Sequence, residues 1–122
     1  MSLDYRDKLV LLQTLEYIQE VDTTLKRFGL EFETFIEDFV YKNSVSMSAM
    51  QIGELKNSLS DEFIEKYGSY FDWDSLRKLR NQFAHAYARI DEEIIWDFAT
   101  RKAPELEEVI NRVLLEDRKQ EK

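Results

Sequence analysis

The spacing of apolar residues predicts a long helix near the start of the chain. From Tyr5 to Phe28, apolar residues fall at helical spacing at positions 5, 9, 12, 15, 18, 21, 25 and 28. Steps of three and four residues place these side chains on one face of an α-helix, which we expect to face the core. Gly29 follows at once, where a helix end favours a residue that can adopt a positive φ.

A second helical pattern extends over residues 31–59. Its polar stretch at residues 42–44 is either a kink or an exposed turn. Ser60 or Asp61 is expected to cap a short helix that Gly68 ends, because short polar side chains accept hydrogen bonds from the first free N–H groups.

Further helices are predicted in the second half of the chain. Asp72 or Asp74 is expected to cap a helix over residues 75–88, and Asp91 caps the next one. Pro104 either starts a new segment after Ala103 or kinks a longer helix, because proline lacks a backbone donor.

These patterns predict an all-α fold, an up-and-down bundle of four to five helices. The 122 residues leave room for a single domain over residues 1–122, with the charged residues 116–122 as a frayed tail. Three Gly and one Pro are too few turn formers for a fold of many short strands, and 43% apolar residues suffice for a core. No run approaches the ~18–20 apolar residues of a membrane span, and no signal peptide is evident. We therefore expect a cytoplasmic protein that does not contact membranes.

Composition and charge exclude several kinds of functional site and bear on whether the protein binds nucleic acid. Cysteine is absent, which excludes disulfides, a thiol nucleophile and a zinc ribbon. The 17 basic and 25 acidic residues give a net charge of −8, which by itself argues against a nucleic-acid partner. Residues 75–90, however, contain four basic residues and no acidic one, which leaves 13 basic and 25 acidic residues elsewhere, a balance of −12.

The basic segment also holds the single histidine of the chain. At about 100° per residue, Arg80, Arg77, Asn81 and His85 share a face beside the predicted core stripe of residues 76, 79, 83, 87 and 90. Arginine suits phosphate oxygens, and histidine exchanges protons near neutral pH. Taken alone, a lone histidine and a basic helix face are more often structural or solvated than catalytic.

The string from Arg80 to Tyr87 has the spacing Arg-x4-His-x-Tyr, with Asn81 directly after the arginine. It resembles the signature of the HepT-like branch of the HEPN superfamily (higher eukaryotes and prokaryotes nucleotide-binding domains). Four further blocks are similar to the family pattern, and the match covers residues 50–115: Ile52-Gly53-Glu54, Phe71-Asp72-Trp73, residues 90–97 and residues 103–106.

The resemblance implies a helical HEPN fold, a homodimer, and metal-independent endoribonuclease activity used as the toxin of a toxin–antitoxin pair. Arg80 and His85 would be the catalytic residues, with Asn81 in support. A minimal nucleotidyltransferase antitoxin would silence the toxin by adding AMP to Tyr87. No cofactor is implied.

Cleaving RNA through its 2′-hydroxyl needs a base, an acid and positive charge on the phosphate. One chain supplies one histidine, whereas a two-fold dimer that pairs the motif helices supplies two. We therefore expect the active unit to be the dimer, with Arg77, Lys78 and Arg89 attracting RNA to its cleft.

Carboxylates offer two further interpretations. Glu54 lies in an apolar helix pattern, and we expect it to pair with Arg80 or Arg77, either as a structural salt bridge or by positioning the catalytic arginine. A metal site is not expected, because the acidic clusters lie on predicted exposed faces and no second histidine is present.

Two alternatives to the ribonuclease stay open from the sequence. One is a non-catalytic HEPN module that binds nucleotide or presents substrate to a partner nucleotidyltransferase. The other is a helical dimer that acts only as an interaction domain.

Overall fold

The computed structural model describes residues 2–83 and 90–120, and every regular element in these ranges is helical. The elements in order are α1 (Tyr5–Phe28), α2 (Phe32–Glu37), α3 (Phe39–Gly53), α4 (Leu55–Ser58), α5 (Asp61–Tyr67), a 3-10 turn (Gly68–Tyr70), α6 (Trp73–Asn81), α7 (Glu92–Asp97), a π-helical turn (Phe98–Lys102) and α8 (Ala103–Gln120). The predicted all-α class is confirmed, although several short helices stand where fewer, longer ones were predicted.

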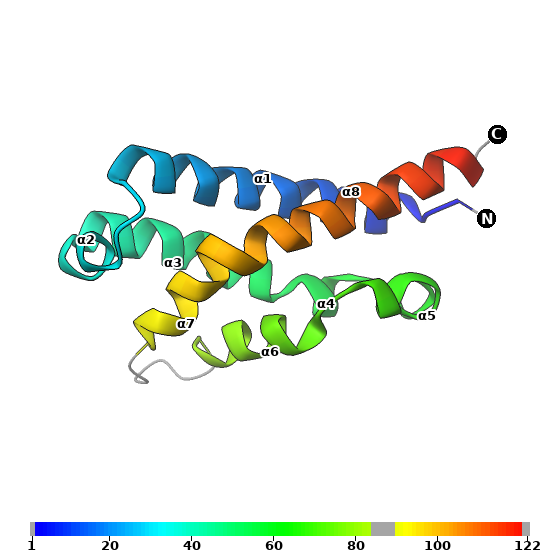
Figure 1. The fold of residues 1–122 in the computed structure, drawn as a ribbon. Coiled ribbons are helices and arrows are strands. Elements are labelled where there is room, and N and C mark those ends of the chain that lie inside the picture. Colours follow the sequence, from blue (N-terminus) through cyan, green and yellow to red (C-terminus); the bar gives the residue numbers. More distant parts are fainter. Residues whose placement is uncertain (1, 84–89, 121–122) are drawn as a thin grey trace.

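The long helices α1, α3 and α8 run side by side, and α6 lies along the lower edge in Figure 1. The segment before α1 contacts the last turns of α8, where the Leu3 N–H donates to the buried Asp117 carboxylate over 2.6 Å. Fully buried side chains of these helices, including Leu11, Tyr41 and Ile110, form the core. Burial of this apolar surface is the main force that holds the helices together.

Helix α1 has the predicted ends but not entirely the predicted inner face. Gly29 has φ 96°, as its place at the helix end predicts. Ile18, Val21 and Leu25 are buried as predicted, whereas Tyr5, Leu9 and Leu12 are exposed, which corrects the sequence interpretation. The first half of α1 instead buries three other residues, namely Asp7, Leu11 and Thr14.

Asp7 explains this change of face. Its carboxylate accepts hydrogen bonds from the Ser60 N–H at 2.9 Å and the Ser60 hydroxyl at 2.6 Å. Because buried carboxylates need such donors, this contact fixes which side of α1 turns inward near its start.

The second predicted helix is divided. Asp38 is extended (φ −97°, ψ 107°) and its carboxylate caps α3 by accepting from the Val40 and Tyr41 N–H groups. A short carboxylate that binds nearby N–H groups competes with a continuous helix, which accounts for the break. Residues 42–44 do not form a turn, since they lie inside α3.

The other predicted caps are largely confirmed. Ser60 accepts from the Phe63 N–H, Asp72 accepts from the Ser75 N–H, and Asp91 accepts from the N–H groups of Glu93 and Ile94. These local contacts need no tertiary context, which is why they can be predicted from sequence.

Pro104 lies within a continuous helical path of α7, the π-helical turn and α8, so the longer-helix interpretation applies. Helix α8 extends to Gln120, with Asp117 buried and the Tyr70 hydroxyl donating to Glu116 over 2.8 Å. The prediction of a frayed tail is therefore wrong for residues 116–120. Among the described residues, no helix is long and apolar enough to cross a membrane.

Candidate functional site

Helix α6 carries the described part of the motif. Asp72 caps its start, and Leu76 and Leu79 are buried against the core. Arg77, Lys78, Arg80 and Asn81 are exposed on its remaining surface. The division between core stripe and basic face that the spacing predicts is therefore confirmed for these residues.

Helix α6 approaches the end of α3 closely at Gly53. A Cβ atom placed on Gly53 would lie 3.4 Å from both the Cα and the backbone N of Arg80. Gly53 thus lies directly against the backbone of α6 at the position of Arg80, where a Cβ atom would just reach ordinary van der Waals contact.

Glu54 follows Gly53 and contacts the Arg80 guanidinium. Arg80 Nε lies 3.4 Å from Glu54 Oε1, and Asn57 Nδ2 donates to the other carboxylate oxygen over 3.2 Å. The predicted pairing of Glu54 is present, and its partner is Arg80 rather than Arg77. Both side chains are about half exposed, at 54% and 49%, so the guanidinium keeps open N–H groups for a further ligand.

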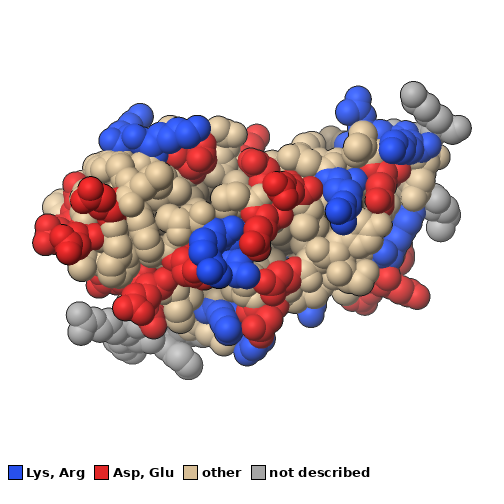
Figure 2. Space-filling model, in the orientation of Figure 1, with Lys and Arg blue, Asp and Glu red and all other residues tan. Residues whose placement is uncertain are grey.

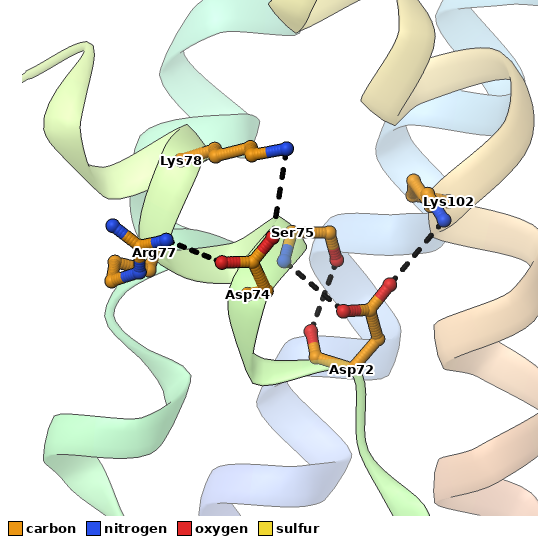
Figure 3. Close-up of polar contacts among 6 residues, drawn as sticks. All are labelled: Asp72, Asp74, Ser75, Arg77, Lys78 and Lys102. Carbon is orange, nitrogen blue, oxygen red and sulfur yellow. Dashed lines mark hydrogen bonds and ion pairs between the residues drawn. The ribbon is translucent and has the colours of Figure 1, made fainter.

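Asp74 engages the other two cations of α6. Its carboxylate accepts a hydrogen bond from Arg77 and lies 3.5 Å from Lys78 Nζ, and Figure 3 shows it between the two side chains. The Arg77 hydrogen bond, with the charges of Arg77 and Lys78, holds the pKa of Asp74 below its usual range. Asp74 is therefore ionised at neutral pH and offsets part of the positive charge of α6.

Arg77 and Lys78 line two different grooves. Arg77 shares a groove with Arg80, whereas Lys78 lines a groove that also contains Asp91, Glu93 and Asp97. The structure thus brings Arg77 and Arg80 together and directs Lys78 toward more acidic surroundings.

Asp72 and Lys102 also line the groove of Lys78. The hydrogen bond from the Ser75 N–H, helped by Lys102 at 3.3 Å, holds the pKa of Asp72 below its ordinary value (Figure 3). Asp72 thereby links the start of α6 to the π-helical turn.

Helix α6 ends at Asn81, earlier than the predicted helix over residues 75–88, and Gln82 and Phe83 form a turn. The predicted site residues His85, Tyr87 and Arg89 lie outside the described residues. On either side of that stretch, Gln82 Oε1 accepts from the Asp91 N–H over 2.8 Å. The chain therefore leaves α6 and enters α7 at neighbouring points.

Sequence reasoning missed three residues beside Arg80. Lys56, Asn57 and Trp73 line the same groove as Arg77 and Arg80. Trp73 belongs to a block that resembles the family, but nothing in the local pattern marks Lys56 or Asn57, because residues of α4 and α6 line one groove only in the folded chain.

The charges on the surface are mixed. Figure 2 shows Lys and Arg in separate groups among Asp and Glu on the face drawn. Within the described ranges, no three His, Cys, Asp or Glu side chains gather as metal ligands.

Comparisons with known proteins identify the family. The family described as "Ribonuclease HepT-like" matches residues 14–113, which extends the resemblance into α1. "Putative RNase TTE0752" of Caldanaerobacter subterraneus subsp. tengcongensis is 32% identical over 106 residues, covering 85% of this chain and 94% of the relative. "Putative RNase MJ0127" of Methanocaldococcus jannaschii is 35% identical over 92 residues, covering 72% and 75%. No solved structure matches the chain. With its all-helical fold, the Arg80 face of α6 and these matches, the chain belongs to the HepT-like ribonuclease family of the HEPN superfamily.

Proposed function

We propose that the protein is a metal-independent endoribonuclease, the toxin of a toxin–antitoxin pair, and that it acts as a homodimer. The observation that carries this proposal is the setting of Arg80. This arginine is half exposed, is held by the half-exposed Glu54, and shares its groove with Arg77. In a chain of net charge −8, such a groove is suited to receive a phosphate.

Arg80 is placed to exchange ligands. Exposed ion pairs contribute only about 0.2–1 kcal/mol, so a phosphodiester can share or replace the Glu54 contact at small cost. Glu54 keeps the guanidinium oriented before RNA binds, which makes it a positioning residue in this proposal.

The reaction needs no metal. One imidazole removes the proton of the 2′-hydroxyl, and the 2′-oxygen attacks the adjacent phosphorus atom. The bond from phosphorus to the 5′-oxygen breaks, and an imidazolium protonates that oxygen. The products are a 2′,3′-cyclic phosphate and a 5′-hydroxyl, while Arg80 neutralises the charge that develops on the phosphate.

Two imidazoles require two chains, because the sequence has one histidine. In the proposed dimer, His85 of each chain faces the same cleft, one as base and the other as acid. Asn81, exposed beside Arg80 on α6, binds a phosphate oxygen or orients an imidazole. Arg77, Lys78 and Arg89 raise the local concentration of RNA.

The same site offers a means of control. A minimal nucleotidyltransferase that transfers AMP from ATP to the Tyr87 hydroxyl, with release of pyrophosphate, would add a bulky anion beside the cleft. This group would repel RNA and occupy its space.

Cleavage with EDTA present tests the proposal directly. We expect the wild-type protein to cleave RNA in EDTA and leave 2′,3′-cyclic phosphate ends, and we expect His85→Ala to lose at least about 100-fold in rate, the usual contribution of a general acid or base. Equal cleavage by both proteins would mean a contaminant. Absence of cleavage by both would favour the non-catalytic nucleotide-binding module.

The antitoxin is tested separately. Incubation with a nucleotidyltransferase encoded beside this gene and ATP should add AMP to the wild type but not to Tyr87→Phe, as measured by mass spectrometry. Unmodified wild-type protein after this incubation would refute the proposed control.

A further inference from the structure

A groove of about 440 Å³ lies beside Arg80, at the junction of α3, α4 and α6. Its walls include the cations Lys56, Arg77 and Arg80 together with Asn57 and Trp73. All of these residues are described by the structure, and they come from separate segments of the chain.

The aromatic wall of the groove is held in place from behind. The Trp73 indole stacks on Phe71, with ring centroids 4.6 Å apart and 10° between the planes. Lys56 Nζ lies over the indole, 5.6 Å from its centroid. Leu76 adds a further apolar surface. A flat aromatic group therefore finds a rigid partner there, provided that the flexible lysine moves aside.

The cations of the groove are available to an anion in different degrees. Arg77 is paired with Asp74 and Arg80 with Glu54, and in both pairs the side chains are about half exposed or more. Lys56 has no carboxylate partner among residues 2–83 and 90–120; its described contact is the indole. An ammonium held only by a ring at an exposed site gains about 0.5–1 kcal/mol from that contact, less than a phosphate offers.

An aromatic surface beside several cations matches the chemistry of a nucleotide, which joins a flat base to a phosphate. We propose that this groove binds one nucleotide of single-stranded RNA next to the cleaved bond, with the base stacked on Trp73 and its phosphate on Lys56 and Arg77. This inference rests on the proposed function, because Arg80, which lines the same groove, then contacts the phosphate that is cleaved.

Binding is measured without cleavage by using an RNA oligonucleotide methylated on every 2′-oxygen. In a Trp96→Phe background Trp73 is the sole tryptophan, so stacking of a base should quench its fluorescence. Lys56→Gln should weaken binding by roughly tenfold at low salt and reduce the slope of log K against log salt by about 0.7, the value for one phosphate contact to a single strand.

Lys66→Gln is the matched control, since this lysine also lies over an aromatic ring, Tyr67, but does not line the groove. It should leave the affinity unchanged. If Trp96→Phe does not fold, anisotropy of a labelled oligonucleotide on the otherwise wild-type protein gives the Lys56 comparison. Unchanged fluorescence on saturation with RNA, or equal affinities of the Lys56→Gln and Lys66→Gln proteins, would overturn the proposal.

Two further arms separate the possible explanations. Quenching by free AMP at the same concentrations as the oligonucleotide would overturn the RNA site in favour of a free-nucleotide site. If the methylated oligonucleotide quenches Trp73 but the protein does not cleave unmodified RNA, RNA binding in the groove is supported and the ribonuclease proposal is refuted. If cleavage is lost in His85→Ala but is unchanged in Lys56→Gln, the ribonuclease proposal is supported and the proposed role of the groove is refuted.

Discussion

Asp74 controls how much positive charge the exposed face of α6 presents. It contacts both Arg77 and Lys78, and the Arg77 hydrogen bond is the chief reason that its pKa is lowered. A lowered pKa means that this ion pair supports folding above the ordinary carboxyl pKa and is lost as the pH falls through the lowered value. At neutral pH Asp74 is thus a fixed competitor of any phosphate that approaches Arg77.

Removing this competitor should strengthen RNA binding. We expect Asp74→Asn to bind the methylated oligonucleotide about two- to fivefold more tightly at low salt, which corresponds to the release of an exposed ion pair. The gain should shrink as salt is added, because exposed charges are screened. Asp22→Asn, which frees Lys26 on α1 in the same way, is the control and should change nothing. Weaker binding by Asp74→Asn would contradict the placement of phosphate at Arg77.

At the scale of elements, the approach of α3 and α6 determines where Arg80 stands. Gly53 lies at this contact, and a Cβ there would meet the Arg80 backbone at the limit of ordinary packing distance. A methyl group fits at that distance, and we expect a longer side chain to push the two helices apart. The site therefore depends on a residue that contributes no functional group.

A graded substitution at Gly53 tests this dependence. Gly53→Ala should stay within about 1 kcal/mol of the wild-type stability, because its contact is offset by the better helix propensity of alanine. Gly53→Leu should cost about 1–3 kcal/mol through overpacking and should reduce RNA cleavage further than its folded fraction explains. Urea unfolding and the cleavage assay measure the two effects. A Gly53→Leu protein with wild-type stability and cleavage rate would show that the contact between α3 and α6 at Gly53 does not determine the position of Arg80.

At the scale of the whole molecule, the net charge of −8 does not describe any one part of the surface. Helix α6 gathers arginine and lysine, yet Asp74 and Glu54 lie against them. Attraction of RNA is therefore confined to short range, and the dimer proposed above would concentrate it by bringing two copies of α6 together.

Co-refolding wild-type chains with His85→Ala chains tests the composite site. Random pairing in an equimolar mixture makes about one quarter of the dimers fully wild type and about half of them mixed. A mixed dimer keeps one imidazole and lacks either the base or the acid, so we expect the mixture to show about one quarter of the activity of the same total concentration of wild-type dimer. Native mass spectrometry counts the mixed dimers. Activity of about one half, in proportion to the wild-type chains, would refute a cleft that needs both histidines.

The sequence by itself determined the helical class, the ends of α1, the cap Asp91 and the family, and it placed two further caps to within two residues, at Ser60 or Asp61 and at Asp72 or Asp74. These features are local, since a cap contacts N–H groups two or three residues away and helical periodicity repeats within a turn. The exposed positions of Arg77 and Arg80 on α6 follow from the same periodicity once Leu76 and Leu79 face the core.

The tertiary structure alone decided the rest. The inner face of early α1 depends on Ser60, which is 53 residues from Asp7, and the choice of Arg80 over Arg77 as the partner of Glu54 spans 26 residues. The groove exists only because α4 brings Lys56 to Trp73 and Gly53 admits α6. No local pattern encodes such contacts. They form when separate helices pack their apolar faces together, which brings polar side chains beside those faces into contact.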